Sequence, residues 1–190
     1  LHLAKILELS LTQGVAPGST YGLAWFGVMA AERFSAYHDG HAYCLAALKL
    51  IEKHGLEVDL TSALLALDQV SAWTASMELA RQTALEAIDS GRLSGDLAMA
   101  CYAHNHLVSD SLIMGHHLQT VVEEIERGLV TVRQYDYRDI EHILLAQQAF
   151  VSAMCDGPQA HRANIEVPLP EALGHTATSC TTLFFKHLFD

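Results

Sequence analysis

The sequence predicts an all-α fold in which antiparallel helical hairpins stack side by side as an α-solenoid. Hydrophobic residues make up 51% of the 190 residues, and alanine and leucine, which favour helix, dominate the composition. Apolar residues recur at helical spacing in segments that are separated by short turns rich in glycine, proline and aspartate. These segments pair off along the chain, which predicts hairpins rather than a sheet.

The spacing of glycines predicts a repeat. Gly55 and Gly91 are expected to end helices and are 91 − 55 = 36 residues apart. Gly40 and Gly115 are expected in turns and are 115 − 40 = 75 residues apart, or about two such periods. A period of about 36–39 residues built from two helices is typical of a helical-hairpin solenoid, of which the nearest type, the tetratricopeptide (TPR) repeat, has about 34 residues. We therefore expect a TPR-like superhelix.

The N-terminal part is predicted to form two helices. Residues 1–12 carry an apolar helical face, and a turn that contains Pro17 comes next. Ser19 or Thr20 is a natural N-cap for a second helix, which runs to about Ala36 and is apolar on nearly all sides, so it should lie inside the array. The face of the first helix consists of Leu3, Ile6, Leu7 and Ser10.

Three further helices are predicted next, each closed by a turn. A turn at His38–Asp39–Gly40 precedes the third helix, and Asp59 or Thr61 opens the fourth. Trp25 and Trp73 lie on apolar faces and are expected in the core, with Trp73 partly exposed beside the next turn. The expected ranges are 41–54, 61–73 and 77–90.

Residues 94–135 are predicted to form the clearest hairpin, two helices joined by a turn at Met114–Gly115. The first helix has a face of small and aromatic residues, and the second has an apolar stripe against a charged outer side. Arg127 is placed to pair with Glu123 one turn earlier. The first face consists of Ala98, Cys101, Tyr102 and Asn105, the stripe of Val121, Ile125, Leu129 and Val132, and the outer side mainly of Glu123, Glu124, Glu126 and Arg133.

The last part of the chain completes the expected domain organisation. Asp136 and Asp139 are spaced as a capping box ahead of an eighth helix that reaches about Met154. We expect residues 1–155 to form the helical-repeat array, as a fragment of a longer chain. Residues 156–173, which contain three prolines, are expected to form an irregular loop, and residues 174–190 to begin a further helix.

Composition excludes several classes of function. The net charge is −11 and there is no basic run, so nucleic-acid binding through a cationic face is not expected. The four cysteines form no CxxC pair, which fits a reducing, cytoplasmic environment. There is no signal peptide, and no apolar run reaches the roughly 18 residues that a membrane span needs.

Twelve histidines are the unusual feature of the composition. His38–Asp39 has the residue pair that metal phosphohydrolases use, and His104, Asp110, His116 and His117 are the residues that would have to complete such a site. The alternative to a scaffold is therefore a small, all-α, histidine-rich, metal-dependent hydrolase. The spacing favours packing and turn roles instead, and His104–Asn105–His106 lies in the middle of a predicted helix, where a nuclease finger would not place it. We assign no metal ligand.

No other catalytic or cofactor motif is present in the sequence. There is no phosphate-binding loop, no dinucleotide fingerprint and no nucleophile elbow, and no cysteine has a histidine at an informative spacing. We therefore assign no catalytic or cofactor-binding residue and expect no cofactor. A second alternative is a small-ligand sensing domain with its pocket between the apolar second helix and the sixth helix.

The order of these residues resembles one region of a known family. The apolar helix from Tyr21, the run AYCLAALKLIEKHG that ends at Gly55, and the run SGRLSGDLAMACYAHNHLVSDSLIMGHHL resemble the helical-repeat region of large bacterial signalling proteins. Those proteins join a serine/threonine-kinase-like domain and a STAND-type ATPase domain to a GAF domain and a sensor histidine kinase. The S-G-x-x-x-G-D-L pattern at 90–97 and the turn at Gly115 are its most specific parts.

The resemblance implies a non-catalytic connector within an ATPase and histidine-kinase signalling protein. The family's catalytic motifs are absent from this chain, so no catalytic residue is carried over. The implied partners are other proteins or neighbouring domains of the same chain. Because a segment cut from an array exposes apolar surface at its ends, we also expect homo-oligomers in solution.

Overall fold

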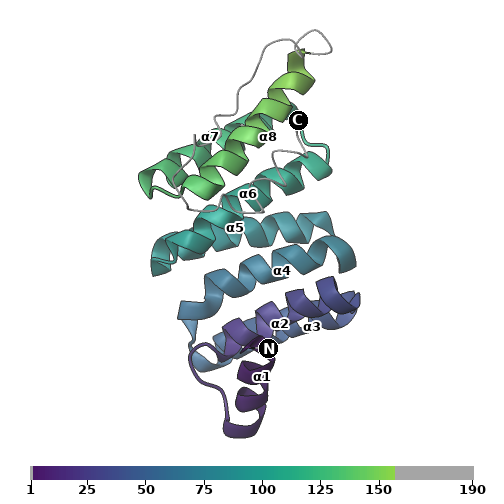
Figure 1. Ribbon diagram of the computed structural model, residues 1–190, viewed down its shortest axis with the longest axis vertical. Coiled ribbons are helices and arrows are strands. Elements are labelled where there is room, and N and C mark those ends of the chain that lie inside the picture. The colour runs from purple at the N-terminus through teal and green to yellow at the C-terminus, as the bar shows by residue number, and fades with distance from the viewer. Residues whose placement is uncertain (1, 157–190) are drawn as a thin grey trace, which may run out of the picture. The chain divides into compact units, whose positions relative to one another are not determined.

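The computed structural model describes residues 2–156, and every regular element in this part is helical (Figure 1). The all-α class is confirmed for these residues. The chain divides into two compact units, residues 1–106 and 107–190, with the division inside α6. The elements are α1 (His2–Gln13), α2 (Ser19–Phe34), α3 (Tyr37–His54), the 3-10 turn η1 (Glu57–Asp59), α4 (Leu60–Thr74), α5 (Met77–Ser94), α6 (Leu97–Ile113), α7 (Leu118–Gln134) and α8 (Arg138–Asp156).

The helices end at nearly equal intervals along the sequence. The residues directly after α2, α3, α4 and α5 are Ser35, Gly55, Ala75 and Gly95. Helix ends therefore recur at intervals of about 20 residues and helix pairs at intervals of about 40 residues, which exceeds the roughly 34 residues of a TPR unit. Tyr135, directly after α7, continues the series two intervals beyond Gly95. The two-helix interval is close to the expected 36–39 residues, although Gly91, from which the value of 36 was counted, does not end a helix.

Two glycines that were expected at a turn or a helix end lie inside helices instead. Gly40 is in the first turns of α3, which begins at Tyr37, so the predicted turn at 38–40 was wrong. Gly91 is buried in α5, which continues to Ser94 and ends at Gly95 in the left-handed conformation. A Cβ on Gly91 would lie 2.7 Å from the Cβ of Ala100. At both positions glycine serves close packing, and glycine identity alone does not distinguish that role from a turn.

The α2–α3 pair crosses with backbone almost in contact. A Cβ on Gly27 would lie 2.5 Å from the carbonyl oxygen of Gly40, and a Cβ on Gly40 would lie 2.5 Å from that of Gly27. The Cys44 thiol donates to the Ala24 carbonyl at 3.4 Å, one turn further along. Gly27 of α2 thus lies against Gly40 of α3, and the earlier residue Ala24 lies against the later residue Cys44. The two helices are therefore antiparallel, and only a short connection joins them.

The helix α4 runs parallel to α2 within the same unit. Asp59, just before α4, accepts a hydrogen bond from Thr20 near the start of α2. Further along both helices, Ser62 accepts a hydrogen bond from the Trp25 indole at 3.5 Å, so α2 and α4 run in the same direction. Figure 1 shows α4 beside the α2–α3 pair and α5 beside α4. The core between α2, α3 and α4 is made of small and aliphatic residues, which include Ala24, Val28, Ala31, Cys44, Ala47, Ala63, Ala66 and Val70.

Asp59 joins the start of α2 to the start of α4. Its carboxylate accepts hydrogen bonds from the backbone N–H of Gly18 at 3.0 Å, from that of Tyr21 at 3.3 Å and from the Thr20 hydroxyl at 2.5 Å. Asp59 directly precedes α4, as expected for the residue that opens this helix, but its side chain makes no capping hydrogen bond there. Its carboxylate instead binds donors at the N-terminus of α2, where a negative charge is stabilised by the free N–H groups.

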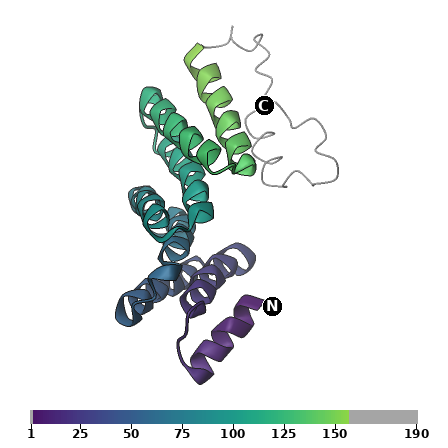
Figure 2. The same ribbon diagram turned by 90° about the vertical axis from the view of Figure 1, so that its left-hand side faces the viewer.

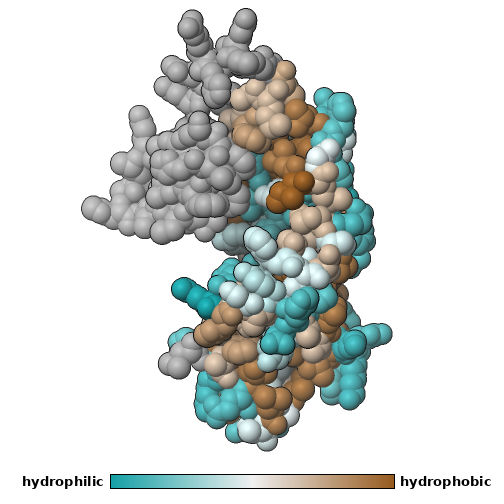
Figure 3. Space-filling model, turned by 90° about the vertical axis from the view of Figure 1, so that its right-hand side faces the viewer, coloured by the Kyte–Doolittle hydropathy of each residue, from teal (hydrophilic) through white to brown (hydrophobic). Residues whose placement is uncertain are grey.

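The first helix packs as its apolar face predicts. Leu3, Ile6, Leu7 and Ser10 are the half-buried residues of α1 among exposed neighbours. Ile6 contacts α2 at Gly22, where no side chain intervenes. Apolar and polar side chains alternate over the surface of α1 to α5 in the lower part of Figure 3, so exposure of single apolar residues is common in this unit.

In the second unit, α7 packs against α8 (Figure 2). The predicted stripe is confirmed, because its four residues are at most 5% exposed. Glu124 was assigned wrongly to the outer side and is buried. Arg127 donates to the backbone carbonyl of Glu123 at 3.1 Å rather than pairing with its carboxylate. On α8 the buried Gln147 amide donates to Ser109 of α6 at 3.0 Å.

The eighth helix is present and extends to Asp156. Asp136 precedes it with a φ of 53°, and its carboxylate accepts a hydrogen bond from the Arg138 guanidinium at 3.0 Å. The expected loop at 156–173, beyond its first residue, and the expected helix at 174–190 lie outside the described residues. Among the helices that are described, none has the length and apolar character needed to cross a bilayer.

Candidate functional site

The histidines that suggested metal chemistry occupy separate places. His38 and Asp39 are exposed in the first turn of α3. His104 is buried in the middle of α6, and the His117 imidazole accepts a hydrogen bond from the Gln119 N–H at 3.2 Å at the start of α7. Within residues 2–156 no group of three histidine, cysteine, aspartate or glutamate side chains is placed to hold a metal ion. The geometry therefore does not favour the hydrolase alternative.

One histidine has a partner that the sequence did not indicate. Nδ1 of His106 on α6 lies 2.7 Å from Oδ2 of Asp68 on α4. The Asp68 side chain is only 1% exposed. A buried carboxylate is costly unless it is paired, and His106 is placed to pair with Asp68 when its imidazole is protonated.

The described cysteines do not form a reactive site. Burial raises the pKa of the Cys44 thiol to about 12 and that of the Cys101 thiol to about 11. Both thiols are therefore protonated at neutral pH, and the thiolate is the nucleophilic form. Cys155, on α8, is exposed.

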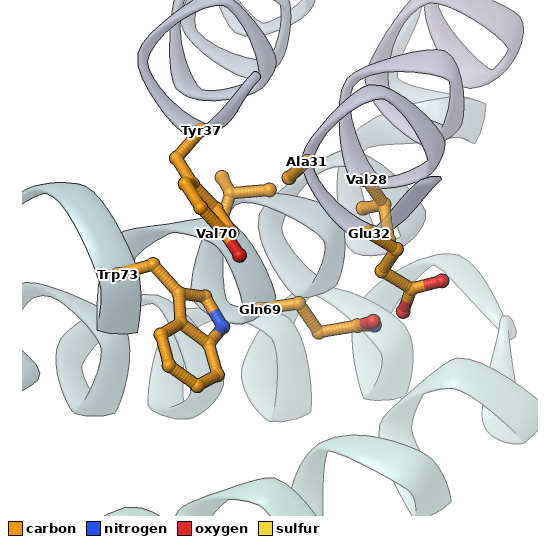
Figure 4. A pocket seen from close by; sticks show the side chains of 7 residues that line it. All are labelled: Val28, Ala31, Glu32, Tyr37, Gln69, Val70 and Trp73. Atoms are coloured by element: carbon orange, nitrogen blue, oxygen red, sulfur yellow. The ribbon is translucent and has the colours of Figure 1, made fainter. Parts of the chain in front are cut away.

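A pocket of about 190 Å³ lies in the first unit where α2 and α4 end and α3 begins (Figure 4). Because α2 and α4 are parallel, their last two turns lie at the same end of the unit, and the short connection from α2 brings the start of α3 there as well. The lining residues are Val28, Ala31 and Glu32 from α2, Tyr37 from α3, and Gln69, Val70 and Trp73 from α4.

Two aromatic rings form one wall of this pocket. The rings of Tyr37 and Trp73 are stacked, with centroids 6.0 Å apart and an angle of 30° between their planes. Trp73 is 72% exposed and Tyr37 is 38% exposed. Aromatic side chains contribute most to the stability of a fold when they are buried, so this pair contributes less than a buried pair would. Trp73 was expected in the core with partial exposure beside the turn, but it is largely exposed. An exposed, stacked aromatic pair is a surface suited to contact with a ligand or partner.

Glu32 and Gln69 form a second, polar wall of the pocket, and the floor below is apolar. Val28, Ala31 and Val70 are buried and form the floor. In Figure 4 the Gln69 amide lies between the Trp73 indole and the Glu32 carboxylate. Among the described residues no cation lies within ion-pairing distance of Glu32.

The pocket could not be found from the sequence for a definite reason. Helical spacing relates residues close together along the chain, whereas the pocket combines residues 28 to 37 with residues 69 to 73. Tyr37 was also expected before the third helix, so nothing paired it with Trp73. The expected ligand pocket between the second and sixth helices differs from the observed one, to which α6 contributes no lining residue. The usable signal was Trp73 itself, a tryptophan at a helix end.

Comparison with curated sequences finds a protein that is weakly similar to this chain. The chain is 25% identical over 159 residues to hybrid signal transduction histidine kinase G of Dictyostelium discoideum. The aligned region covers 80% of this chain and 4% of that protein. No protein-family model matches the chain, and no solved structure matches it significantly. Because this protein is from Dictyostelium, the similarity does not support the bacterial origin that the sequence resemblance implied.

Proposed function

We propose that the chain is a non-catalytic helical-repeat segment that connects domains, or binds a partner protein, in a histidine-kinase signalling protein. The observation that supports this proposal most is the regular interval of about 20 residues between helix ends, which gives a two-helix period of about 40 residues. Each hairpin of such an array contacts only its neighbours, and together the hairpins present a long surface for binding.

The packing of the first unit supports a repeat of this kind. The α2–α3 pair is antiparallel and α4 repeats the direction of α2, as successive hairpins of a solenoid would. The similarity to a hybrid histidine kinase supports the signalling context, and the whole protein's kinase activity is part of the proposal because the chain matches only 4% of that relative. A cytoplasmic location belongs to the same proposal.

Two measurements test the proposal. A compact globular chain of 190 residues has a radius of gyration of about 16 Å, and a superhelical array should exceed this value in small-angle X-ray scattering. In the full-length protein, deletion of residues 1–155 should leave ATP-dependent autophosphorylation chemically competent and alter its regulation or its partners. Phosphoryl transfer or hydrolysis by the purified 190-residue chain would contradict a non-catalytic role.

A further inference from the structure

The pocket formed by Glu32, Tyr37, Gln69 and Trp73 has a chemical character that the proposed function leaves unspecified. We infer that it binds an arginine side chain presented by a partner protein. This inference rests on the proposed function, because it names the chemistry of the partner that the repeat segment would recognise. Size, charge and the geometry of the aromatic wall each lead to it.

The size of the pocket limits the occupant to a single side chain. Pockets for drug-sized ligands are typically about 300–1,000 Å³, and this one is about 190 Å³. It is also open to solvent on the side of Trp73, which is 72% exposed. A side chain on an extended partner segment can enter from that side while its backbone stays outside.

The electrostatics favour a cation. The Glu32 carboxylate lines the pocket without a described cationic partner. The C-terminal ends of α2 and α4 both point their free carbonyl groups towards this end of the unit, and each helix C-terminus carries a partial negative charge. Arg33 in the last turn of α2 offsets part of this charge, but it does not line the pocket. The N-terminus of α3 also lies here and opposes this field, but Asp39 in its first turn offsets it. The net charge of −11 would attract a basic segment from a distance.

The aromatic wall favours arginine over lysine. A cation over the face of a tryptophan or tyrosine ring is attracted by the ring's quadrupole, and tryptophan is the strongest partner. The planar guanidinium can stack on an aromatic face and donate at the same time to a carboxylate and an amide oxygen. Trp73 supplies the face, Glu32 the carboxylate and Gln69 the amide, and all three line one pocket. A lysine ammonium can use the charge but not the stacking geometry.

The experiment uses the ¹⁵N-labelled 190-residue chain and three synthetic pentapeptides, Gly-Ser-X-Ser-Gly with blocked ends, in which X is arginine, lysine or citrulline. Citrulline has the shape of arginine without its charge. The chain has two tryptophans, so each indole N–H gives its own signal, and Trp73→Phe identifies that of Trp73. We expect saturable shifts of the Trp73 signal with the arginine peptide, weaker binding of the lysine peptide and none of the citrulline peptide.

Matched variants separate the pocket from general acidity. Glu32→Gln should weaken the arginine peptide about tenfold, because it removes the charge and keeps the shape. Glu57→Gln makes the same change at another exposed glutamate of this unit and should leave binding within about twofold. Trp73→Ala, followed through the backbone amide signals of Glu32, Tyr37 and Gln69, should abolish binding. Thermal unfolding of each variant checks that the fold is retained.

Three results would overturn the inference. They are equal binding of the citrulline and arginine peptides, equal weakening by Glu32→Gln and Glu57→Gln, or a Trp73 signal that responds to protein concentration and not to peptide. The last result would assign the pocket to a second copy of this chain. Each of these outcomes leaves the scattering and deletion tests of the repeat segment unaffected, so failure of the arginine site is distinguishable from failure of the proposed function.

Discussion

The α2–α3 pair has two neighbouring regions that differ in how closely the helices pack, the crossing of Gly27 with Gly40 and the pocket that Val28 and Tyr37 help to line. At the crossing, Gly27 and Gly40 bring two backbones so close that neither can carry a side chain without displacing the other helix. At the pocket, Val28 and Tyr37 begin a space of about 190 Å³ that opens past an exposed tryptophan. The crossing fixes the position of α3 against α2, and this position places Tyr37 beside Trp73 in the pocket.

This difference separates residues that specify the fold from residues that are available for binding. Tyr37 comes less than one turn of α3 before Gly40, so its position over Trp73 depends on the crossing. A small-residue crossing next to an exposed aromatic pair therefore keeps the pocket formed before any partner arrives. A preformed site avoids the entropic cost of ordering side chains upon binding.

The largest expected effect comes from adding one methyl group at the crossing. Gly40→Ala places a Cβ 2.5 Å from the Gly27 carbonyl oxygen, and the two helices must move apart to relieve it. We expect a loss of about 3 kcal/mol in the free energy of unfolding, at the upper end for overpacking. Urea denaturation monitored by far-ultraviolet circular dichroism measures it.

The matched control is Gly55→Ala. Gly55 has a φ of +65° at the end of α3, with nothing within 4 Å of an added Cβ, so the substitution strains the backbone without a clash. We expect it to cost about 1 kcal/mol. A smaller loss for Gly40→Ala than for Gly55→Ala would show that the crossing is not close-packed as described.

These two glycines also show how far the sequence predicts local structure. Gly55 was predicted correctly, because a glycine after a helix whose last turn holds Lys53 and His54 has a local signal. Gly40 was assigned to a turn, because the reason for glycine there is the backbone of Gly27, which local sequence does not reveal. The same limit explains Gly91, whose neighbour is Ala100 on the next helix.

Periodic faces were predicted well, and contacts between separate segments were not. The stripe of α7 and the face of α1 follow from helical spacing alone, and both are observed. The pair His106–Asp68 and the pocket each depend on residues far apart in the sequence. The candidate site could therefore be anticipated only through Trp73, the one member whose residue type and position at a helix end were unusual.

The protection of Cys44 tests whether the crossing stays closed in solution. A Cβ on Gly27 would lie 3.1 Å from its sulfur, and burial raises the pKa of the Cys44 thiol to about 12. At pH 8 its thiolate fraction is then about 10⁻⁴, and it rises with pH because the thiolate is the deprotonated form. We expect a thiol reagent at pH 8 to modify the exposed Cys155 at least about a thousandfold faster than Cys44, as measured by peptide mapping with mass spectrometry.

The control for this measurement is the same reaction in denaturing urea, where Cys44 and Cys155 should react at similar rates. Gly40→Ala should raise the rate at Cys44 in native buffer, because the reaction then depends on opening of the crossing. Similar native rates at the two cysteines would contradict a closed crossing.

The smallest expected effect on stability is at the pocket. Trp73→Ala removes a large side chain, but that side chain is 72% exposed and its described ring contact is the stack with Tyr37. We expect a change within about 1 kcal/mol in the free energy of unfolding. Val70→Ala, in the pocket floor and 1% exposed, should cost about 2 kcal/mol because it leaves a cavity. Equal losses would mean that Trp73 supports the fold, whereas a small loss together with lost peptide binding would mean that the tryptophan serves recognition.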